Sequence, residues 1–434
     1  MQKLLASDRP LNEAGRKALL EMSREVSLYS ADFKSPFQDK VVVLGVTGSI
    51  SCYKAVDLAS KLTQAGALVD VILTDSATQF VTPLTFRSIT HRQVVVEMFE
   101  SNTQYSLEHV ALARRADVVV VAPATAHTIA KMAHGLADNM LTTTLLATEA
   151  PIVVAPAMDA NMNQSPAVKK NLAALHEFGI TVVGPLIGRL ASGLWGSGRL
   201  MDPPELMGHI AAVLGKSGDL VGRTVVVSAG GTAEPIDPVR VVTNRSSGKQ
   251  GYALAEAARD RGARVTLVAT HTKLADPAAV EVIHIETVAQ MRTAILKACE
   301  KADVLIMAAA VSDFRPATAE RHKIKKPIGD DTLSLELAQN PDFLLEVPDR
   351  LVKVGFAAES KDLLKNARQK LATKRLNLIA ANDITKPDSG FGTESNRVTI
   401  LDNDGGVEEV PLCTKYEVGH RILDRVATLL NQRS

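Results

Sequence analysis

The sequence predicts an α/β protein with two doubly wound, Rossmann-like parallel-sheet domains in tandem. Three observations lead to this fold class. The chain has 434 residues, which is long enough for two or three domains. From Lys40 onward, continuous apolar runs of strand length alternate with helical patterns, as is typical of a parallel sheet covered on both faces. The scheme begins again at Arg223, and "KADVLIMAAAVSDF" is similar in pattern to the earlier "RADVVVVAPATAHT".

The elements of each half follow from these runs. In the first half, "KVVVLGVTGSISCYK" predicts a strand and a glycine turn before a helix that ends at Gln64, and further buried strands are predicted over residues 116–125 and 150–158. In the second half, "RTVVVSAGG" predicts a strand and a turn, and "GYALAEAARDRGARVTLVAT" predicts a helix and a strand. Residues 214–222 ("LGKSGDLVG") have the composition of a linker. We therefore predict domains over residues 40–215 and 222–434.

Residues 1–39 form an N-terminal extension. Its apolar residues have the spacing of one face of an amphipathic helix, at Leu11, Ala14, Leu19, Met22 and Val26. Such a helix either packs on its own chain, which we favour, or binds a partner. The segment lacks the apolar core and the cleavage-site pattern of a signal peptide.

Composition excludes several classes of function. Lys and Arg number 49 against 48 Asp and Glu, so no overall field attracts nucleic acid or an anionic membrane surface. No apolar run reaches the ~20 residues of a membrane span. The three cysteines, Cys52, Cys299 and Cys413, lie far apart and form no CxxC pair, which disfavours a disulfide framework or a zinc ribbon and favours the cytoplasm.

Three segments have the residues of an anion site. "GVTGSIS" (45–51) lies between a strand and a helix, where free N–H groups and the helix dipole favour a phosphate, but a merely tight turn is equally compatible. "NRSSGKQG" (244–251) has two hydroxyls, a glycine and a lysine before a helix; an anion nest is favoured over an ordinary cap, and a P-loop is disfavoured because the first glycine is missing. "RHKIKKPIGDD" (321–331) is either a solvated charged loop, which is the commoner case, or a basic loop that closes over a triphosphate.

Histidines and a glycine-rich stretch are the remaining candidates. "GRLASGLWGSGRLMDP" (188–203) has the glycine content of a mobile flap over a ligand. His109 precedes a buried strand, and a lone histidine is more often structural than catalytic. His127 and His134 are seven residues apart on one predicted helix, but no carboxylate or cysteine stands at ligand spacing, so a metal site is disfavoured.

The motifs taken together resemble known families from Lys40 to the C-terminus. "GVTGSIS..YK", "EHVALARRADVVVVAPATA", "KMAHGLADNMLTTTLLA", "PAMDANM" and "GSGRLMDP" resemble the flavin-dependent cysteine decarboxylases. "SAGGTAEPIDPVRVVTNRSSGKQGYALA", "AAAVSDF", "KIKK", "NPD", "GFAAES" and "AND" resemble phosphopantothenate–cysteine ligase. In this order they resemble the bacterial bifunctional enzymes of coenzyme A biosynthesis.

For the second half, the resemblance implies a CTP-dependent ligase. The carboxylate of 4′-phosphopantothenate attacks the α-phosphate of CTP, pyrophosphate leaves, and the amine of cysteine then displaces CMP from the acyl-cytidylate. Mg²⁺ is expected with the nucleotide. Asn244 and Lys323 are the implied catalytic residues. The positions implied for binding CTP and the acyl substrate are Arg240, Ser246, Ser247, Gly248, Lys249, Ala309, Asp313, Pro341, Asp342, Phe343, Phe356, Lys370 and Lys374.

For the first half, the resemblance implies an FMN-dependent decarboxylase of the phosphopantothenoylcysteine product. FMN oxidises the cysteine thiol to a thioaldehyde, CO₂ leaves, a cysteine on the flap protonates the resulting enethiolate, and the reduced flavin then returns its two electrons. His109 matches the histidine that acts near the thiol. The positions implied for FMN are Gly48, Ser49, Ile50, Thr74, Ala122, Pro123, Ala124 and Thr125, and Met162 belongs to the implied substrate motif.

Three residues depart from the decarboxylase pattern. Ser192 stands where the flap cysteine is expected, and an alcohol is a much weaker acid than a thiol with its reference pKa of about 8.5. Asp159 replaces the asparagine of PxMNxxM and would place a negative charge against the substrate carboxylate. His127 replaces another asparagine of that family.

These departures leave the role of the first half open. Four alternatives follow for this half. It could complete the decarboxylation, stop at the release of an enethiol, act on a changed substrate, or only bind flavin beside a working ligase. A non-enzymatic flavin-binding protein is disfavoured by the intact ligase motifs, and a dinucleotide-dependent oxidoreductase by the absence of GxGxxG. The resemblance also implies a homo-oligomer, in which flavoprotein trimers and paired ligase domains form a dodecamer.

Overall fold

The computed structural model describes residues 33, 35–98, 108–325, 332–359, 361–383 and 392–433. The helix predicted in the N-terminal extension falls almost entirely outside the described residues. Phe33 lies inside them, and its ring packs edge-on against Tyr416 and His420 near the C-terminus.

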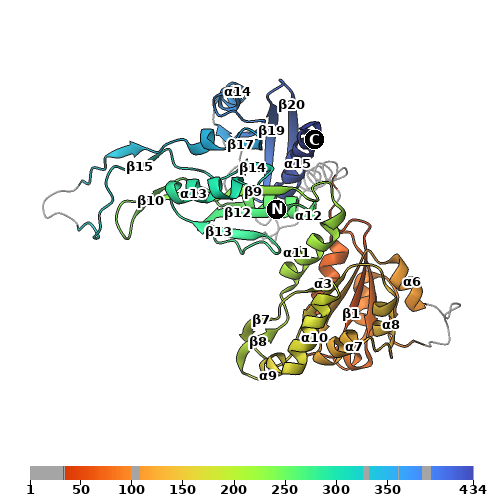
Figure 1. Ribbon diagram of the computed structural model, residues 1–434. Helices are drawn as coiled ribbons and strands as arrows, with labels where there is room; N and C mark the ends of the chain where they lie inside the picture. The colour runs from red at the N-terminus through yellow and green to blue at the C-terminus, as the bar shows by residue number, and fades with distance from the viewer. Residues whose placement is uncertain are drawn as a thin grey trace, which may run out of the picture.

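The first half contains a six-stranded sheet in the order β3-β2-β1-β4-β5-β6, and every neighbouring pair is parallel (Figure 1). Its apolar β-branched residues are buried on both faces, where they belong to two separate apolar layers. The strands are β1 (Val41–Val46), β2 (Leu68–Leu73), β3 (Val94–Val95), β4 (Val118–Ala124), β5 (Ile152–Pro156) and β6 (Thr181–Val182).

Helices cover both faces of this sheet, and the helix predicted to end at Gln64 does so. They are α3 (Cys52–Gln64), α4 (Asp75–Thr78), α5 (Pro83–Thr90), α6 (Glu108–Arg115), α7 (Ala126–His134), α8 (Met140–Ala147), α9 (Ala160–Gln164), α10 (Pro166–Glu177) and α11 (Pro203–Leu214). The predicted flap is an antiparallel ribbon of β7 (Leu186–Arg189) and β8 (Trp195–Arg199), which lies beside α9 at the edge of this half (Figure 1).

The second half contains an eight-stranded sheet in the order β13-β12-β9-β14-β17-β18-β19-β20. Its first six strands are parallel, as predicted, whereas β19 and β20 are antiparallel additions that the sequence analysis did not predict. The strands are β9 (Thr224–Ala229), β12 (Arg264–Thr270), β13 (Glu281–Ile285), β14 (Val304–Met307), β17 (Val352–Glu359), β18 (Leu378–Asp383), β19 (Ser395–Asp402) and β20 (Val407–Thr414). The helices are α12 (Lys249–Asp260), α13 (Val288–Cys299), α14 (Leu363–Thr373), α15 (Lys415–Arg433) and the 3₁₀ turn η2 (Phe343–Glu346).

Two short ribbons extend from the second half as an arm (Figure 1). One pairs β10 (Ala233–Pro235) with β11 (Val241–Thr243), and the other pairs β15 (Phe314–Pro316) with β16 (Leu337–Gln339). The amide of Glu320 donates to the carbonyl of Ile236 at 2.9 Å, which joins the two ribbons.

The segment with linker composition is a packed junction. The 3₁₀ turn η1 (Gly215–Ser217) follows α11 directly, and Gly215 is buried. A Cβ atom on Gly215 would lie 2.6 Å from the carbonyl oxygen of Asp260, and one on Gly218 would lie 2.3 Å from that of Arg261. The glycines that give this segment its linker composition therefore permit a close backbone approach between the two halves.

Among the described residues, none of the helices has both the length and the apolar composition that a membrane crossing requires.

Candidate functional site

Each sheet has its cavity at the same topological position. In the first sheet the strand order reverses between β1 and β4, and in the second between β9 and β14. The carboxyl ends of two parallel strands diverge at such a reversal and leave a crevice for a ligand. We call the first the flap cavity, lined by residues of the 48–54 and 189–192 segments, and the second the nest cavity, lined by residues 244–251 and 307–313.

The flap cavity has a volume of about 580 Å³. One wall is the turn between β1 and α3, which contains Gly48, Ser49 and Ile50. Within the described residues, the backbone N–H groups of these three have no hydrogen-bond acceptor, and all three residues line the cavity. A helix start with free N–H groups is a site for an anion.

Hydrogen bonds between neighbouring strand ends fix this turn. The Thr47 hydroxyl donates to the carbonyl of Pro123 at 2.7 Å and accepts from the amide of Thr125 at 3.0 Å. A Cβ on Gly48 would lie 2.4 Å from the Cβ of Ser76. Glycine is therefore required at position 48 by the close approach of the chain after β2.

The two departures from the decarboxylase pattern contact each other. The hydroxyl of Ser192 donates to a carboxylate oxygen of Asp159 at 2.8 Å. The other oxygen of Asp159 accepts from the amide of Asn161 at 2.9 Å and caps the start of α9. The Asn161 amide, followed by the Ser192 hydroxyl, lowers the pKa of Asp159, so this carboxyl stays ionised.

The structure brings seven of the first-half candidates to the flap cavity and leaves five outside it. Those that line it are Gly48, Ser49, Ile50, Thr125, Asp159, Met162 and Ser192. Those that do not are His109, Thr74, Ala122, Pro123 and Ala124. Ala122 and Ala124 are fully buried in β4. His109 lies in the first turn of α6.

Sequence reasoning missed the cations of the flap cavity. Lys54 is buried, and its ammonium donates to the Leu200 carbonyl at 2.8 Å and to Asp202 at 2.7 Å. Arg199 pairs with the same carboxylate, and Arg189 lines the cavity from the flap. The "YK" and "GR" of the quoted motifs contained these residues, but only the fold brings Lys54 and Asp202 together.

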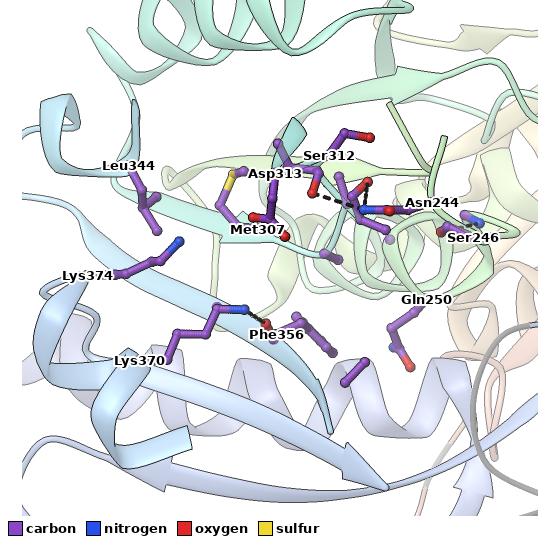
Figure 2. Close-up of a pocket in the computed structure, with 18 of the residues that line it drawn as sticks. Asn244, Ser246, Gln250, Met307, Ser312, Asp313, Leu344, Phe356, Lys370 and Lys374 are labelled. Atoms are coloured by element: carbon purple, nitrogen blue, oxygen red, sulfur yellow. Dashed lines mark hydrogen bonds between the residues drawn. The ribbon is translucent and has the colours of Figure 1, made fainter. Parts of the chain in front are cut away.

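The nest cavity has a volume of about 600 Å³. Gly248 has a φ of 77° and immediately precedes α12, so the Ser246–Gly248 turn presents its backbone at the start of that helix. The side-chain amide of Asn244 donates to the carbonyl of Val311 at 3.1 Å, which ties the nest to the segment after β14 (Figure 2).

Lysines gather at both ends of the nest cavity. Lys370 donates to the Phe356 carbonyl at 2.8 Å, and burial, with the neighbouring Lys374 as a smaller cause, lowers the pKa of its ammonium (Figure 2). Lys374 pairs with Asp342 at 3.1 Å. At the other end, Lys249 bonds the Gly392 carbonyl and Glu394. This distribution of charge suits an elongated polyanion.

Most second-half candidates meet in this cavity. Those that line it are Asn244, Ser246, Ser247, Gly248, Lys249, Ala309, Asp313, Pro341, Asp342, Phe343, Phe356, Lys370 and Lys374. Arg240 and Lys323 do not line it in this single chain. Both lie on the arm, where Asp237 bonds Arg240 and the amide of Ile324.

Several lining residues were not singled out as site candidates. They include Gln250, Met307, Ser312, Asn340, Asn382, Asn396 and Lys415. The "AND" motif contained Asn382, but nothing local in the sequence places Lys415, at the start of α15, beside residues of α12.

Comparison with known families covers both halves. The model of the Flavoprotein family matches residues 33–215, and the model of the DNA/pantothenate metabolism flavoprotein C-terminal domain matches residues 220–430. Within the described ranges, no three His, Cys, Asp or Glu side chains gather as ligands for a metal ion.

Relatives extend along nearly the whole chain. The coenzyme A biosynthesis bifunctional protein CoaBC of Bacillus subtilis is 45% identical over 399 residues, covering 90% of this chain and 97% of that protein. The protein of the same name from Mycobacterium tuberculosis H37Rv is 41% identical over 409 residues, covering 90% and 97%. A crystal structure of the C-terminal domain of a CoaBC protein is 37% identical, covers 50% of this chain and 100% of that chain, and has a TM-score of 0.43. The identity of 45% over 90% of this chain shows that it belongs to the family of coenzyme A biosynthesis bifunctional proteins.

Proposed function

We propose that this chain catalyses two consecutive steps of coenzyme A biosynthesis. The nest cavity joins 4′-phosphopantothenate to cysteine at the expense of CTP, and the flap cavity removes the carboxyl group of the cysteine residue with the help of FMN. The observation that carries this proposal is the convergence of thirteen ligase candidates in one cavity at the reversal point of the second sheet.

The nest cavity has the groups that acyl activation needs. The lysines at its two ends would neutralise the phosphates of CTP and of the acyl substrate, with Mg²⁺ arriving together with the nucleotide. Asn244 is oriented by the carbonyls of Ala310 and Val311, so its amide is held beside the nest, where it can hold the acyl group. Position and charge neutralisation are the main requirements of such transfers.

The flap cavity fits FMN. Three free N–H groups at the start of α3 suit its phosphate, and the exposed apolar side chains of Ile50, Tyr53 and Met162 are available to cover a flat ring. When bound, FMN supplies the two-electron oxidation that turns the substrate carboxylate into a leaving group. This chain's part is to hold the flavin, to position the carboxylate and to deliver a proton from the flap.

The proton delivery differs from that of a flap thiol. Ser192 would offer a hydroxyl proton that already points to Asp159. A hydroxyl is a weak acid, so we expect protonation to be slow. The alternative of a working ligase with an incomplete flavoprotein half is not favoured, because the similarity to the Bacillus subtilis protein covers 97% of that protein and both halves of this chain.

We further propose that the protein is a homo-oligomer. His109 does not line its own flap cavity, and Arg240 and Lys323 do not line their own nest cavity. The arm also exposes large apolar side chains, namely Val239, Val241, Phe314, Leu335 and Leu337. Exposed apolar side chains next to site residues that do not line the cavity of their own chain favour a contact between two copies of this chain. A dodecamer, a cytoplasmic location and the absence of nucleic-acid and membrane partners complete the proposal.

Product analysis tests the assignment. Purified protein with CTP, Mg²⁺, 4′-phosphopantothenate and cysteine should release pyrophosphate and CMP and form phosphopantothenoylcysteine. Asn244→Ala and Lys323→Ala should each reduce this turnover by about 10²-fold or more, as loss of a transition-state contact commonly does. Asn403→Ala, on the exposed turn between β19 and β20, is the matched control. Wild-type rates in both site variants would contradict the proposed ligase site.

A further inference from the structure

Among the residues that the structure describes, one of the cations around the flap cavity has no anionic partner. Four charged side chains line the cavity, namely Lys54, Asp159, Arg189 and Arg199. Lys54 and Arg199 both pair with Asp202, each at 2.7 Å. Asp159 accepts hydrogen bonds from the flap and from α9. Among the described residues, Arg189 has neither an ion pair nor a hydrogen bond to its side chain, although it lines the cavity.

The flap holds Arg189 in a fixed strand. Its antiparallel partner is Trp195, in a ribbon that is anchored on the segment before and within α9. The Met158 amide donates to the Gly198 carbonyl at 3.0 Å, and the Asn163 side chain donates to Ser197 at 3.1 Å. A Cβ on Gly198 would lie 2.1 Å from the Met158 oxygen, so the ribbon packs without space between. The anchored strand fixes the backbone of Arg189 at the rim of the cavity, so its guanidinium stays within reach of a ligand there.

Under the proposed function, the phosphate of FMN binds at the turn before α3 and does not need Arg189. The free N–H groups of Gly48, Ser49 and Ile50 lie at the start of α3, which is a different element from the flap. Arg189 is therefore available for a second anion. Under the proposed function, the substrate has two anionic groups, the carboxylate that leaves and the 4′-phosphate at the other end of the molecule.

The chemistry of the reaction distinguishes these two groups. The carboxylate loses its charge as it becomes CO₂, so a strong cation against it would stabilise the ground state and slow the step. The phosphate keeps its charge throughout the reaction. A cation on the phosphate improves binding without opposing catalysis, and the planar guanidinium matches phosphate oxygens in a bidentate arrangement.

We propose that Arg189 binds the 4′-phosphate of the decarboxylase substrate and makes the flap cavity selective for phosphorylated substrates. This inference rests on the proposed function of the flap cavity. The residue that determines this specificity lies only three positions before Ser192, on the same ribbon.

The test compares two substrates that differ only in the phosphate. Initial rates of CO₂ release are measured with phosphopantothenoylcysteine and with its dephosphorylated form. The wild type should prefer the phosphorylated substrate. Arg189→Gln should reduce that preference by about 10-fold to 100-fold, the size expected for a charged hydrogen bond, through KM and with little change in kcat. Arg189→Lys should retain part of the preference.

Arg87→Gln is the matched control, because it removes the same charge from an exposed position on α5 outside the cavity. Flavin absorbance and light scattering are recorded for each variant. An unchanged preference in Arg189→Gln would overturn this inference while leaving the proposed function intact. Loss of flavin without loss of preference would assign Arg189 to the cofactor, and altered assembly alone would assign it to a subunit contact; either result overturns the inference. A wild type that releases no CO₂ from either substrate would overturn the proposed function and this inference together.

Discussion

Ser192 on the flap donates a hydrogen bond to Asp159 at the start of α9, with 2.8 Å between the two oxygens. Each residue departs from the decarboxylase pattern, and the structure shows that the two departures form one pair. The pair closes the flap onto the helix that follows β5. A substrate carboxylate that enters this region meets an ionised side chain whose pKa is lowered.

Restoring the pattern should therefore accelerate the first-half reaction. Ser192→Cys supplies a thiol acid, and Asp159→Asn removes the repulsion while keeping an oxygen that can cap α9. The effects should be coupled, because both side chains contact each other and one substrate. The measurement is anaerobic formation of 4′-phosphopantetheine by the wild type, both single variants and the double variant.

Asp159→Ala is added to that series to separate the effect of removing the charge from the effect of removing the cap of α9. It removes the cap of α9 and should lower the melting temperature of the protein, whereas Asp159→Asn should not. Rapid wild-type formation of the fully reduced thiol product would show that Ser192 or another group delivers the proton efficiently, contrary to our expectation.

Substitution of Gly48 should remove the flavin. Even an alanine Cβ would lie 2.4 Å from Ser76, so Gly48→Val must displace the turn that offers its N–H groups to the phosphate. We expect purified wild type to be yellow and the variant to be colourless, measured by absorbance near 450 nm. Ligase activity of the same sample is the internal control for folding. A variant with a full complement of FMN would show that the turn does not hold the phosphate.

The affinity for CTP should weaken at alkaline pH. Burial lowers the pKa of Lys370, so this ammonium loses its proton at a lower pH than an ordinary lysine does. The charged form binds phosphate, and therefore the KM for CTP should rise as the pH rises toward the usual lysine value. Lys370→Arg stays charged and should show a flatter profile between about pH 7 and pH 10.

Lys365→Arg, an exposed position on the same helix, is the control for the pH profile. It should retain the wild-type dependence. If Lys370→Arg showed the same rise in KM as the wild type, another group would be responsible.

Subunit mixing tests the proposed oligomer. Asn244→Ala damages the nest cavity, and Arg240→Ala damages the arm. If the arm serves a second copy, mixing the two inactive variants should regenerate roughly a quarter of the sites, as random pairing across a two-fold interface gives. Light scattering should show a homo-oligomer in each sample. A monomer at micromolar concentration, or an assembly without rescue, would contradict this arrangement.

The fold could be predicted because its signals are local. Apolar strands such as Val118–Ala124 and the glycine turns that follow them determine where each parallel strand ends, and ligand crevices follow from strand ends. The antiparallel strands β19 and β20 have mixed polar sequences without that signal. The arm was missed for a related reason, since its strands have only three residues each.

Only the parts of the site that are close together in the sequence could be predicted. The nest residues are consecutive in sequence, and so are Ala309 to Asp313, which made them visible as a group. The ion pair of Lys54 with Asp202 joins residues 148 positions apart, and Gln250 bonds the Lys415 carbonyl across 165 positions. Such pairs exist only once the helices have packed, and no local pattern encodes them.

The two cavities have no lining residue in common among the described residues. The junction between the halves that contain them has close backbone contacts, of Gly215 with Asp260 and of Gly218 with Arg261. We therefore predict that the product of ligation leaves its cavity before it meets the flavin, so that the fusion keeps the two activities in equal amounts without passing the intermediate directly between them. Isotope dilution tests this prediction: unlabelled phosphopantothenoylcysteine added in excess during turnover should dilute the label that [³⁵S]cysteine leaves in 4′-phosphopantetheine. An undiluted label would contradict it.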